Sequence, residues 1–534
     1  MPEISIKNPH LWSSEGGIKF AGRLHYQGKL YNTTETFTLF DKVQNPSQLS
    51  DILLDVHGEF TVIIQNNGEL FFGHAPNGAA VPLFHTNKNG GLISDNYYEI
   101  EDRAGPQRWK PIYGVELLSR GEIWGEKTIH PDIYKITRGM FVVFDFENSS
   151  FESQRYYRIH QAENNDQQQI FDELLSVLDS IFERLNQRVN GKPVLLGLSG
   201  GYDSRLLALM LNRHEFDRVF TYTVNTQSSY DQDIAEKLAN QLGFEWTPIE
   251  HTHEKIQAMY KSDTWWDVEE LAGGYGKHCP NPSSLVTYSE LSQNENLPND
   301  GVRLSGLTPA DGVHIPRFMT ESGKVTVDEI AKYIVEDECS NMPIEDGTTE
   351  MLATRVEDWI SFDKPINNST AINILTNFYI HKHHFGRSGL ISDYFGYEDH
   401  RPFQDPDFLE FYSSLSIEQK YNRNYLESFT EQLNEKYAPT VPIGRPSEMN
   451  DKSHIKQNLK SVIIGSPFES PARFLNQLLT TDSPRDEYEI KYGFLSETVF
   501  DEIHTEGCHY RYYLARDALS QSASGPTDDS AHFV

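Results

Sequence analysis

The chain has 534 residues and a formal net charge of -32, a length that allows roughly two or three domains with sizeable cores. So acidic a composition disfavours a general binder of nucleic acid or of an anionic membrane surface, because both would be repelled. The cysteines Cys279, Cys339 and Cys508 lie far apart, so neither a disulfide scaffold nor a Cys-x-x-Cys site is indicated, and we expect a reducing compartment. With no signal-like start and no run of about 18 apolar residues, the sequence predicts a soluble, cytoplasmic protein.

The first part of the chain is typical of β-structure. The apolar stretches Phe60–Ile64 and Glu69–Phe72 flank Gln65–Gly68, whose Asn-Gly step suits a hairpin turn. Further strands are predicted at 92–94 and 140–144. We therefore predict a β-rich domain over residues 1–160.

The pattern changes near residue 160. Residues 171–185 carry apolar side chains at helical spacing, which is typical of an amphipathic helix. From Val194 onwards predicted strands and helices alternate, as in a parallel α/β sheet, and after about residue 325 the chain is mainly helical. The alternating elements are a strand from 194, a helix over 203–213, a strand over 219–224 and a helix over 231–242. We assign residues 161–520 to this second domain and the polar residues 521–534 to a mobile tail.

The segment Val194–Ser204 carries the clearest chemical signal, because it predicts a buried strand, a glycine turn and the start of a helix. Gly200 and Gly201 would let the backbone approach a phosphate closely. The N–H groups at the start of the helix, with its positive dipole end, would attract an anion, and Ser199 adds a hydroxyl donor. This segment therefore predicts a loop that binds pyrophosphate.

Asp203 and Ser204 follow the two glycines at the start of the predicted helix. A carboxylate would repel a bare phosphate, so Asp203 makes most sense if Mg²⁺ accompanies the nucleotide. ATP and Mg²⁺ are therefore the expected small-molecule partners of this loop.

Two other interpretations of the same segment stay open. A strand, a Gly-Gly turn and a helix also occur as a plain connection in α/β domains. Gly197-x-Ser199-x-Gly201 formally fits the nucleophile elbow of α/β-hydrolases, although the strands that such an elbow needs upstream are of a different kind here. A Walker-type NTPase is not supported, because no Gly-x-x-x-x-Gly-Lys-Ser/Thr segment occurs.

Several segments, taken in order, resemble the asparagine synthetase family, in which a glutaminase-type domain precedes an ATP-pyrophosphatase synthetase domain. The matching segments are 198–204, Tyr222–Val224, Ser228-x-x-Asp231, Leu304–Gly306 followed by Asp311, and Glu398–Asp405. The resemblance implies an α/β fold class. A β-rich glutaminase-like N-terminal domain of the Ntn αββα type would precede a parallel-sheet ATP-pyrophosphatase domain with a helical C-terminal part.

The resemblance also implies site residues and a reaction. A substrate carboxylate would attack the α-phosphate of ATP, pyrophosphate would leave, and ammonia or an amine would displace AMP to give an amide. Asp203 and Asp311 would hold Mg²⁺. The residues expected to bind ATP are Leu198, Ser199, Gly200, Gly201, Asp203, Ser204, Val224, Ser305 and Gly306.

The chain departs from the family pattern at three places. Leu307 stands where the second loop usually has a glutamate. The family carries a lysine two places after an arginine, whereas Arg445 is followed by Pro446 and Ser447, so Arg445 and Lys452 are the candidate catalytic cations. The family nucleophile is an N-terminal cysteine, but removal of Met1 would expose Pro2, so we expect no glutamine hydrolysis. The last departure resembles the β-lactam synthetase and lasso-cyclase branches.

These observations predict an ATP-dependent, AMP-forming amide ligase. Its expected partners are a small-molecule carboxylate substrate and ammonia or an amine donor, with no nucleic acid and no membrane among them, and homodimer formation is left open. The alternatives are a catalytically degenerate ATP-binding scaffold or sensor and a serine hydrolase that uses Ser199.

Overall fold

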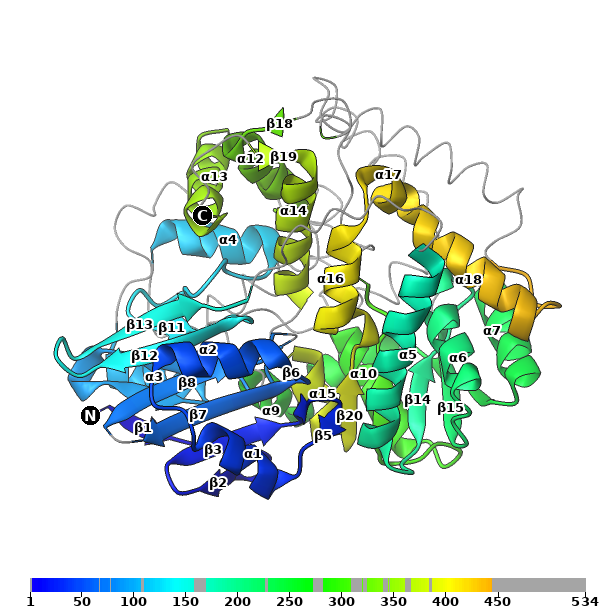
Figure 1. Cartoon of the computed structure of the whole chain (residues 1–534), viewed down its shortest axis with the longest axis horizontal. Helices are drawn as coiled ribbons and strands as arrows, with labels where there is room; N and C mark the ends of the chain where they lie inside the picture. Colours follow the sequence, from blue (N-terminus) through cyan, green and yellow to red (C-terminus); the bar gives the residue numbers. More distant parts are fainter. Residues whose placement is uncertain are drawn as a thin grey trace.

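The computed structural model shows a β-rich region beside a region built on a parallel sheet, with further helices above both (Figure 1). The description covers residues 2–66, 68–76, 78–106, 110–157, 170–225, 229–271, 282–308, 319, 324–339, 344, 346–360, 366–383 and 387–443. No helix among these residues has both the length and the apolar content that crossing a bilayer requires.

Two stacked sheets form the β-rich region. A six-stranded sheet has the order β13-β12-β8-β7-β3-β2, and a four-stranded sheet has the order β1-β10-β9-β11. The predicted hairpin is confirmed, because β7 and β8 pair antiparallel with Gln65 opposite Leu70. The strands are β1 (Glu3–Ser5), β2 (Ser13–Glu15), β3 (Ile18–Gly22), β7 (Phe60–Asn66), β8 (Glu69–His74), β9 (Phe84–Thr86), β10 (Leu92–Ser94), β11 (Tyr134–Lys135), β12 (Met140–Asp145) and β13 (Ser150–Arg155). A small third sheet contains β4 (His25–Tyr26), β5 (Lys29–Leu30) and β6 (Val56–His57).

Helices cover both outer faces of this pair of sheets. On the six-stranded sheet, α1 (Thr33–Phe40) and α2 (Pro46–Asp55) pack their apolar sides against β3, β7 and β8. On the four-stranded sheet, α3 (Tyr97–Ala104) and α4 (Pro111–Arg120) pack against β9 and β10. Between the sheets, Ile63 and Phe72 meet Ile93. The order helix, sheet, sheet, helix confirms the predicted αββα class, and it explains why β7 is buried on both faces.

The second region contains a five-stranded parallel sheet with the order β16-β15-β14-β17-β20. Its strands are β14 (Val194–Gly197), β15 (Val219–Asn225), β16 (Glu245–Glu250), β17 (Gly301–Leu304) and β20 (Tyr397–His400). The chain adds β15 and β16 on one side of β14 and then returns to place β17 on the other side. This reversal makes the gap between the carboxyl ends of β14 and β17 the switch point, where open α/β sheets bind their ligands.

Helices cover both faces of the parallel sheet. One face carries α5 (Ile170–Val189), α6 (Tyr202–Arg213), α7 (Ser229–Leu242), α16 (Pro406–Ser414) and α18 (Asn424–Tyr437). The other carries α8 (His253–Tyr260), α9 (Asp263–Leu271), α10 (Pro282–Gln293) and α15 (Arg387–Tyr394), which share a core with α3 and α4. These bounds confirm the predicted alternation of strands and helices from Val194.

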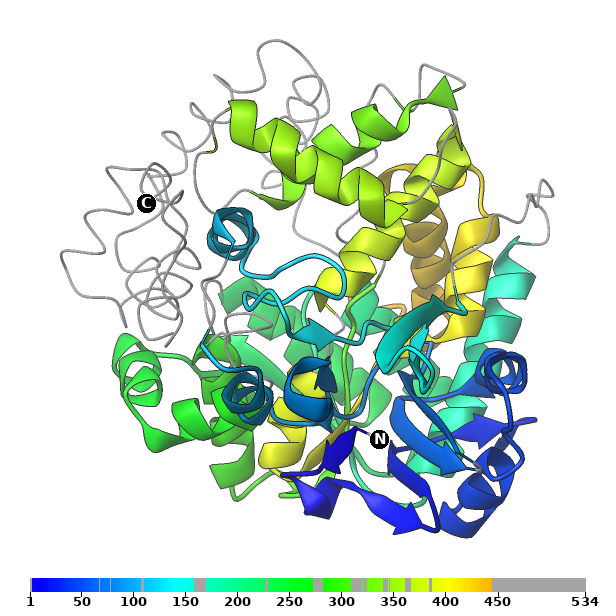
Figure 2. The same cartoon turned by 90° about the vertical axis from the view of Figure 1, so that its left-hand side faces the viewer.

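A separate helical layer lies above α4 and the β-rich region (Figure 2). It contains β18 (Lys324–Val325), α12 (Val327–Glu338), α13 (Asp346–Ile360), β19 (Ile366–Asn367) and α14 (Asn368–His383). Of the shorter elements, η3 (Pro402–Gln404) connects β20 to α16, and α17 (Ile417–Lys420) and η4 (Tyr421–Arg423) connect α16 to α18. The mainly helical character predicted for the chain after residue 325 is thereby confirmed for its described part.

A charged network joins the two regions. His57 Nδ1 lies 3.3 Å from Asp405, and Arg184 donates to Asp405 and Asp407 at 2.8 Å each. Burial raises the pKa of Asp405, but the hydrogen bond from His57 and the charge of Arg184 outweigh this effect and lower the pKa overall. His57, Asp405 and Asp407 are close enough to hold a metal ion, but the guanidinium already bonds both carboxylates. We therefore interpret the cluster as an ion-pair network between regions.

Candidate nucleotide site

The predicted phosphate loop leaves β14 at the carboxyl edge of the parallel sheet. Ser199 and Gly201 are exposed, whereas Gly200 is buried. The Ser199 N–H donates to Ser204 Oγ at 3.1 Å, and the two hydroxyl oxygens lie 3.0 Å apart. Gly201 is the N-cap of α6, and no side chain caps this helix. The loop therefore presents the positive end of a 12-residue helix at an accessible turn, which suits a phosphate.

Gly200 lies where the loop packs against the start of α7. A Cβ atom added to Gly200 would lie 2.8 Å from Asp231 Oδ1 and 3.8 Å from Ile234 Cβ. Only a residue without a side chain therefore lets Asp231 stay this close beneath the turn. The structure thus places Asp231, which the sequence linked to the loop only by family resemblance, against the loop, whereas Ser228 lies outside the described residues.

The second predicted loop meets the first at the switch point. Ser305 follows β17, and its N–H donates to the carbonyl of His400 at 2.9 Å. A Cβ atom on Gly306 would lie 3.4 Å from the backbone nitrogen of Ser204 and 3.6 Å from Asp203 Cβ. Two segments about a hundred residues apart, one after β14 and one after β17, therefore form adjacent walls of one site.

Leu198 and Val224, two of the residues expected to bind ATP, lie at the carboxyl ends of the adjacent strands β14 and β15. The Leu198 N–H donates to the Tyr222 carbonyl at 2.8 Å, and the Leu198 carbonyl accepts from Thr223 Oγ1 at 2.8 Å. These bonds extend the sheet, and the Leu198 side chain is buried. Trp246 Nε1 donates to the same hydroxyl at 2.9 Å. The Leu198 N–H is thus used within the sheet. A contact with the adenine base of ATP would therefore depend on the Leu198 carbonyl and on Val224, which is half-buried.

Asp203 has a cationic partner that the sequence did not suggest. The Arg423 guanidinium donates to Asp203 Oδ1, although the two residues are 220 positions apart. Arg423 adopts a left-handed backbone with φ of 61° just before α18, a conformation uncommon for a residue other than glycine. No motif surrounds Arg423, so only its position in space identifies it. It brings a fixed positive charge to the edge of the phosphate loop.

The residues present at this loop fit a magnesium-bound nucleotide. Mg²⁺ takes oxygen ligands, and it is usually held by one or two carboxylates together with substrate phosphates. Asp203 supplies one such carboxylate beside the accessible turn, and its side chain is 18% exposed. Mg²⁺ and Arg423 would both be attracted to this carboxylate. When a magnesium-bound nucleotide binds, Asp203 would therefore either exchange Arg423 for Mg²⁺ or interact with both cations.

Three of the predicted functional residues lie outside the described part of the chain. They are Asp311, proposed for Mg²⁺, and the candidate cations Arg445 and Lys452. Leu307, the first departure from the family pattern, is described. Its carbonyl accepts from Gln404 Nε2 at 3.4 Å, so the second loop contacts the η3 turn at this residue.

A comparison with protein families matches residues 177–287, from α5 to α10, to the family described as asparagine synthase. This match confirms the family resemblance for the segment that contains the phosphate loop and Asp231. No curated protein sequence matches the chain significantly.

Solved structures show only distant likeness. Glutamine phosphoribosylpyrophosphate amidotransferase from B. subtilis is 12% identical, and the alignment covers 61% of this chain and 60% of that chain with a TM-score of 0.18. NMN synthetase from Francisella tularensis is 15% identical, and the alignment covers 42% of this chain and 98% of that chain with a TM-score of 0.21. The NH3-dependent NAD synthetase from Campylobacter jejuni is 18% identical, and the alignment covers 40% of this chain and 93% of that chain with a TM-score of 0.19. Scores this low carry no argument about function.

Proposed function

We propose that the protein is an ATP-dependent, AMP-forming ligase that joins a small-molecule carboxylate to ammonia or an amine. One observation carries this proposal. Within and beside the segment that matches the asparagine synthase family, the loop at 198–204 and the loop at Ser305–Gly306 meet at the carboxyl-edge switch point of a parallel sheet. A nucleotide placed there would have its phosphates at the N-terminus of α6.

The proposed reaction balances in two steps. A carboxylate oxygen of the substrate attacks the α-phosphorus of ATP, and the bond to the β-phosphate breaks to release pyrophosphate. The amine nitrogen then attacks the acyl carbon, AMP leaves, and the nitrogen loses a proton. The chain contributes positioning and charge: the α6 N-terminus orients the phosphates, and Arg423 stabilises negative charge beside them. Mg²⁺ held by Asp203 would add charge neutralisation at the departing pyrophosphate.

The nitrogen donor is proposed to be ammonia or an amine rather than glutamine. Residues 2–157, which include the glutaminase-like β-rich region, contain no cysteine. Cys339 lies in the helical layer, where burial raises the pKa of its thiol to about 12. Such a thiol is a poor nucleophile. We therefore propose that the β-rich region acts structurally, through its extensive contact with the parallel-sheet region.

The proposal is tested by pyrophosphate release from Mg-ATP in the presence of ammonium and a panel of carboxylates. We expect release with at least one acid, and its loss in Asp203→Asn. The control is Asp217→Asn, which changes an exposed aspartate outside the site and should leave release unchanged. Full activity in Asp203→Asn would contradict the assignment of this site.

A second candidate, the ATP-binding scaffold or sensor, is favoured by the Asp203–Arg423 pair, which satisfies the carboxylate without a metal ion. It predicts saturable ATP binding by calorimetry with no pyrophosphate formed from any acid. The hydrolase alternative finds less support. Among the described residues the partners of the Ser199 hydroxyl are Ser204 and the Gly201 N–H, and no histidine bonds to it.

A further inference from the structure

An arginine interrupts a central strand of the parallel sheet. Arg303 lies on β17, which pairs with a strand on each side, and its neighbours Val302 and Leu304 are buried. Strands covered on both faces are normally continuous apolar runs, because a charge placed there loses much of its hydration. A guanidinium in such a strand adds little to stability even when it is paired, so its presence indicates a functional role.

The side chain of Arg303 lies on the face of the sheet opposite α6. Val302 and Leu304 belong to the core shared with α5 and α6, and side chains alternate along a strand, so Arg303 faces α10. Its contact with Tyr288 of α10 confirms this, because the guanidinium carbon Cζ lies 5.0 Å from the centre of the Tyr288 ring. The Arg303 side chain is 19% exposed, so a ligand can reach part of it.

The guanidinium extends to the end of β14, where the phosphate loop begins. Arg303 Nε donates to the Tyr222 hydroxyl at 2.9 Å. This hydroxyl lies over Gly197, the last residue of β14, because a Cβ atom added to Gly197 would be 3.3 Å from it. Gly197 thus leaves room for the Tyr222 ring, and Arg303 lies beside the start of the loop that contains Ser199.

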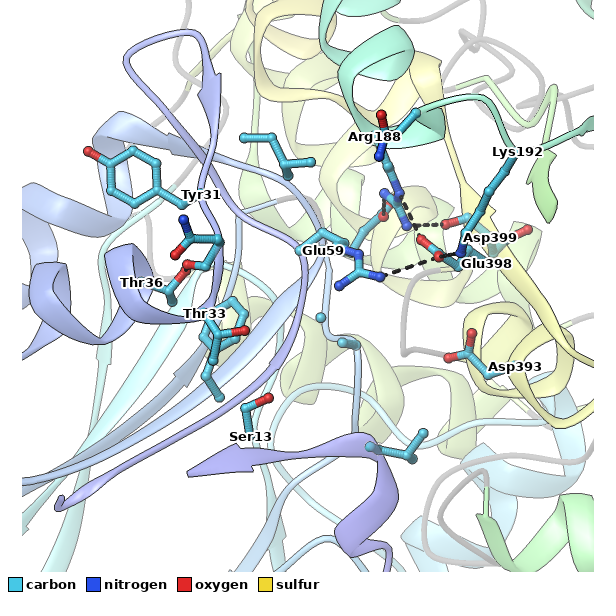
Figure 3. A pocket seen from close by; sticks show the side chains of 18 of the residues that line it. Ser13, Tyr31, Thr33, Thr36, Glu59, Arg188, Lys192, Asp393, Glu398 and Asp399 are labelled. Atoms are coloured by element: carbon cyan, nitrogen blue, oxygen red, sulfur yellow. Dashed lines mark hydrogen bonds and ion pairs between the residues drawn. The ribbon is translucent and has the colours of Figure 1, made fainter. Parts of the chain in front are cut away.

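The carboxylate that contacts Arg303 is shared with a second cation. Arg303 Nη1 donates to Asp399 Oδ1 at 2.8 Å, and Arg401 Nε donates to Asp399 Oδ2 at 2.9 Å. Arg188 donates to the Asp399 carbonyl at 2.9 Å and so fixes this part of β20 from the side of α5 (Figure 3). Because Asp399 serves two guanidinium groups, it compensates the charge of Arg303 only in part. An anion would still be attracted to Arg303.

Two hydrogen-bond donors are unused at this place. Among the described residues, Arg303 Nη2 has no hydrogen-bond partner. The Tyr288 hydroxyl also lacks one, although Tyr288 is only 3% exposed. Burial raises the pKa of Tyr288, so the hydroxyl keeps its proton and can donate it to an anion. A buried donor without an acceptor lowers stability, and a bound anion would remove this cost.

The proposed reaction needs a cation on this side of the sheet. A substrate carboxylate must approach the phosphates of ATP, and the two anions repel each other unless each is held by a positive group. The N-terminus of α6 and Arg423 lie on the face where the phosphates would bind. Arg303 lies on the opposite face of the same strand end, where it would hold and orient the acid.

We propose that Arg303 binds the carboxylate group of the acid substrate, with the Tyr288 hydroxyl as a second donor. This role rests on the proposed ligase function and adds to it the residue that selects the acid. A purely structural role for Arg303, as a brace between β14, β17 and β20, would instead affect the binding of nucleotide and of acid alike.

The test measures nucleotide binding and acid binding separately by isothermal titration calorimetry of the full chain. The protein is first saturated with Mg²⁺ and α,β-methylene-ATP, an analogue that cannot release pyrophosphate, and is then titrated with the carboxylates of the release screen. We expect at least one acid to bind. Arg303→Met should weaken its binding by about tenfold to a hundredfold, the effect of losing one charge-assisted hydrogen bond, and should change nucleotide affinity by less than about threefold.

Three further variants complete the test. Arg303→Lys keeps the positive charge and should bind the acid more tightly than Arg303→Met. Tyr288→Phe should weaken acid binding by about twofold to tenfold, because it removes one neutral donor. Arg218→Met, at an exposed arginine beside the amino end of β15, is the control and should bind both ligands like the unchanged protein.

The outcomes separate this role from the ligase function. If the unchanged protein binds neither nucleotide nor acid, both proposals fail. If it binds both, but Arg303→Met binds the acid as well as Arg218→Met does, only the role of Arg303 is overturned. The same conclusion follows if Arg303→Met loses nucleotide and acid affinity equally. Unchanged acid binding in Tyr288→Phe would overturn the assignment of its hydroxyl as the second donor.

Discussion

Arg205 provides a sharp test of how the phosphate loop is supported. It lies on α6, directly behind the loop, and its side chain is among the largest that are fully buried. Its guanidinium donates to Asn434 Oδ1 at 2.7 Å, to the Val441 carbonyl at 3.3 Å and to the Pro442 carbonyl at 2.7 Å. These bonds attach α6 to α18 and to the segment that follows it. We predict that Arg205→Met loosens this attachment and destabilises the protein.

The magnitude follows from what each acceptor loses. Asn434 Oδ1 is left buried without this donor, which costs about 1–3 kcal/mol. The Val441 carbonyl keeps a bond from Asn434 Nδ2 at 3.1 Å, and the Pro442 carbonyl is only partly buried, so water replaces part of its loss. The methionine restores some packing. The expected net loss is about 2–4 kcal/mol, which corresponds to roughly 4–16 °C in Tm for a domain of a few hundred residues.

The assay is thermal unfolding followed by circular dichroism, with Arg213→Met as the control. Arg213 lies on the same helix and donates to both carboxylate oxygens of Asp179 at 2.8 Å, but its side chain is 27% exposed. Such a surface pair contributes less than about 1 kcal/mol. Equal Tm losses in the two variants would refute the reasoning, because burial would then make no difference to the cost.

Three other variants test the charged interior through pH-dependent thermal unfolding. Burial lowers the pKa of Lys420 to about 7 from 10.5, so the folded state binds fewer protons than the unfolded state between these values and stability rises with pH there. Lys420→Met should therefore raise Tm at pH 7, and this gain in Tm should disappear near pH 10. An equal gain in Tm at both pH values would show that the buried charge of Lys420 is not its cause. Burial lowers the pKa of His57, but Asp405 outweighs it and raises the pKa above 6.5, so the stabilisation is complete below 6.5 and is lost as pH rises through the raised value. His57→Gln should flatten the stability profile in that range, and an unchanged slope would count against the pair. Glu59→Gln leaves Arg188 buried beside the more distant Glu398, so we expect a loss of about 2–3 kcal/mol at pH 7, and a change below 0.5 kcal/mol would show that Glu398 compensates.

Local patterns in the sequence were sufficient for much of the fold. The hairpin at Phe60–Phe72 depends on two apolar stretches and an Asn-Gly turn, and α5 depends on apolar residues at helical spacing. Both signals act between residues close in the chain, so the structure confirms them nearly to the residue. The phosphate loop was predictable for the same reason, because strand, glycine turn and helix are contiguous.

The sequence by itself determined the class of each region and the strand, glycine turn and helix of the loop at 194–204, since these follow from short-range backbone preferences. Only the tertiary structure decided which charges meet. Arg423 reaches Asp203 across 220 residues, and Arg23 reaches Glu398 across 375. It also decided that the carboxylates of Glu59, Glu398 and Asp399 each meet a cationic side chain. Such pairings depend on how helices and sheets pack in space, because a charge interacts with whatever the fold places beside it and not with its neighbours in the chain.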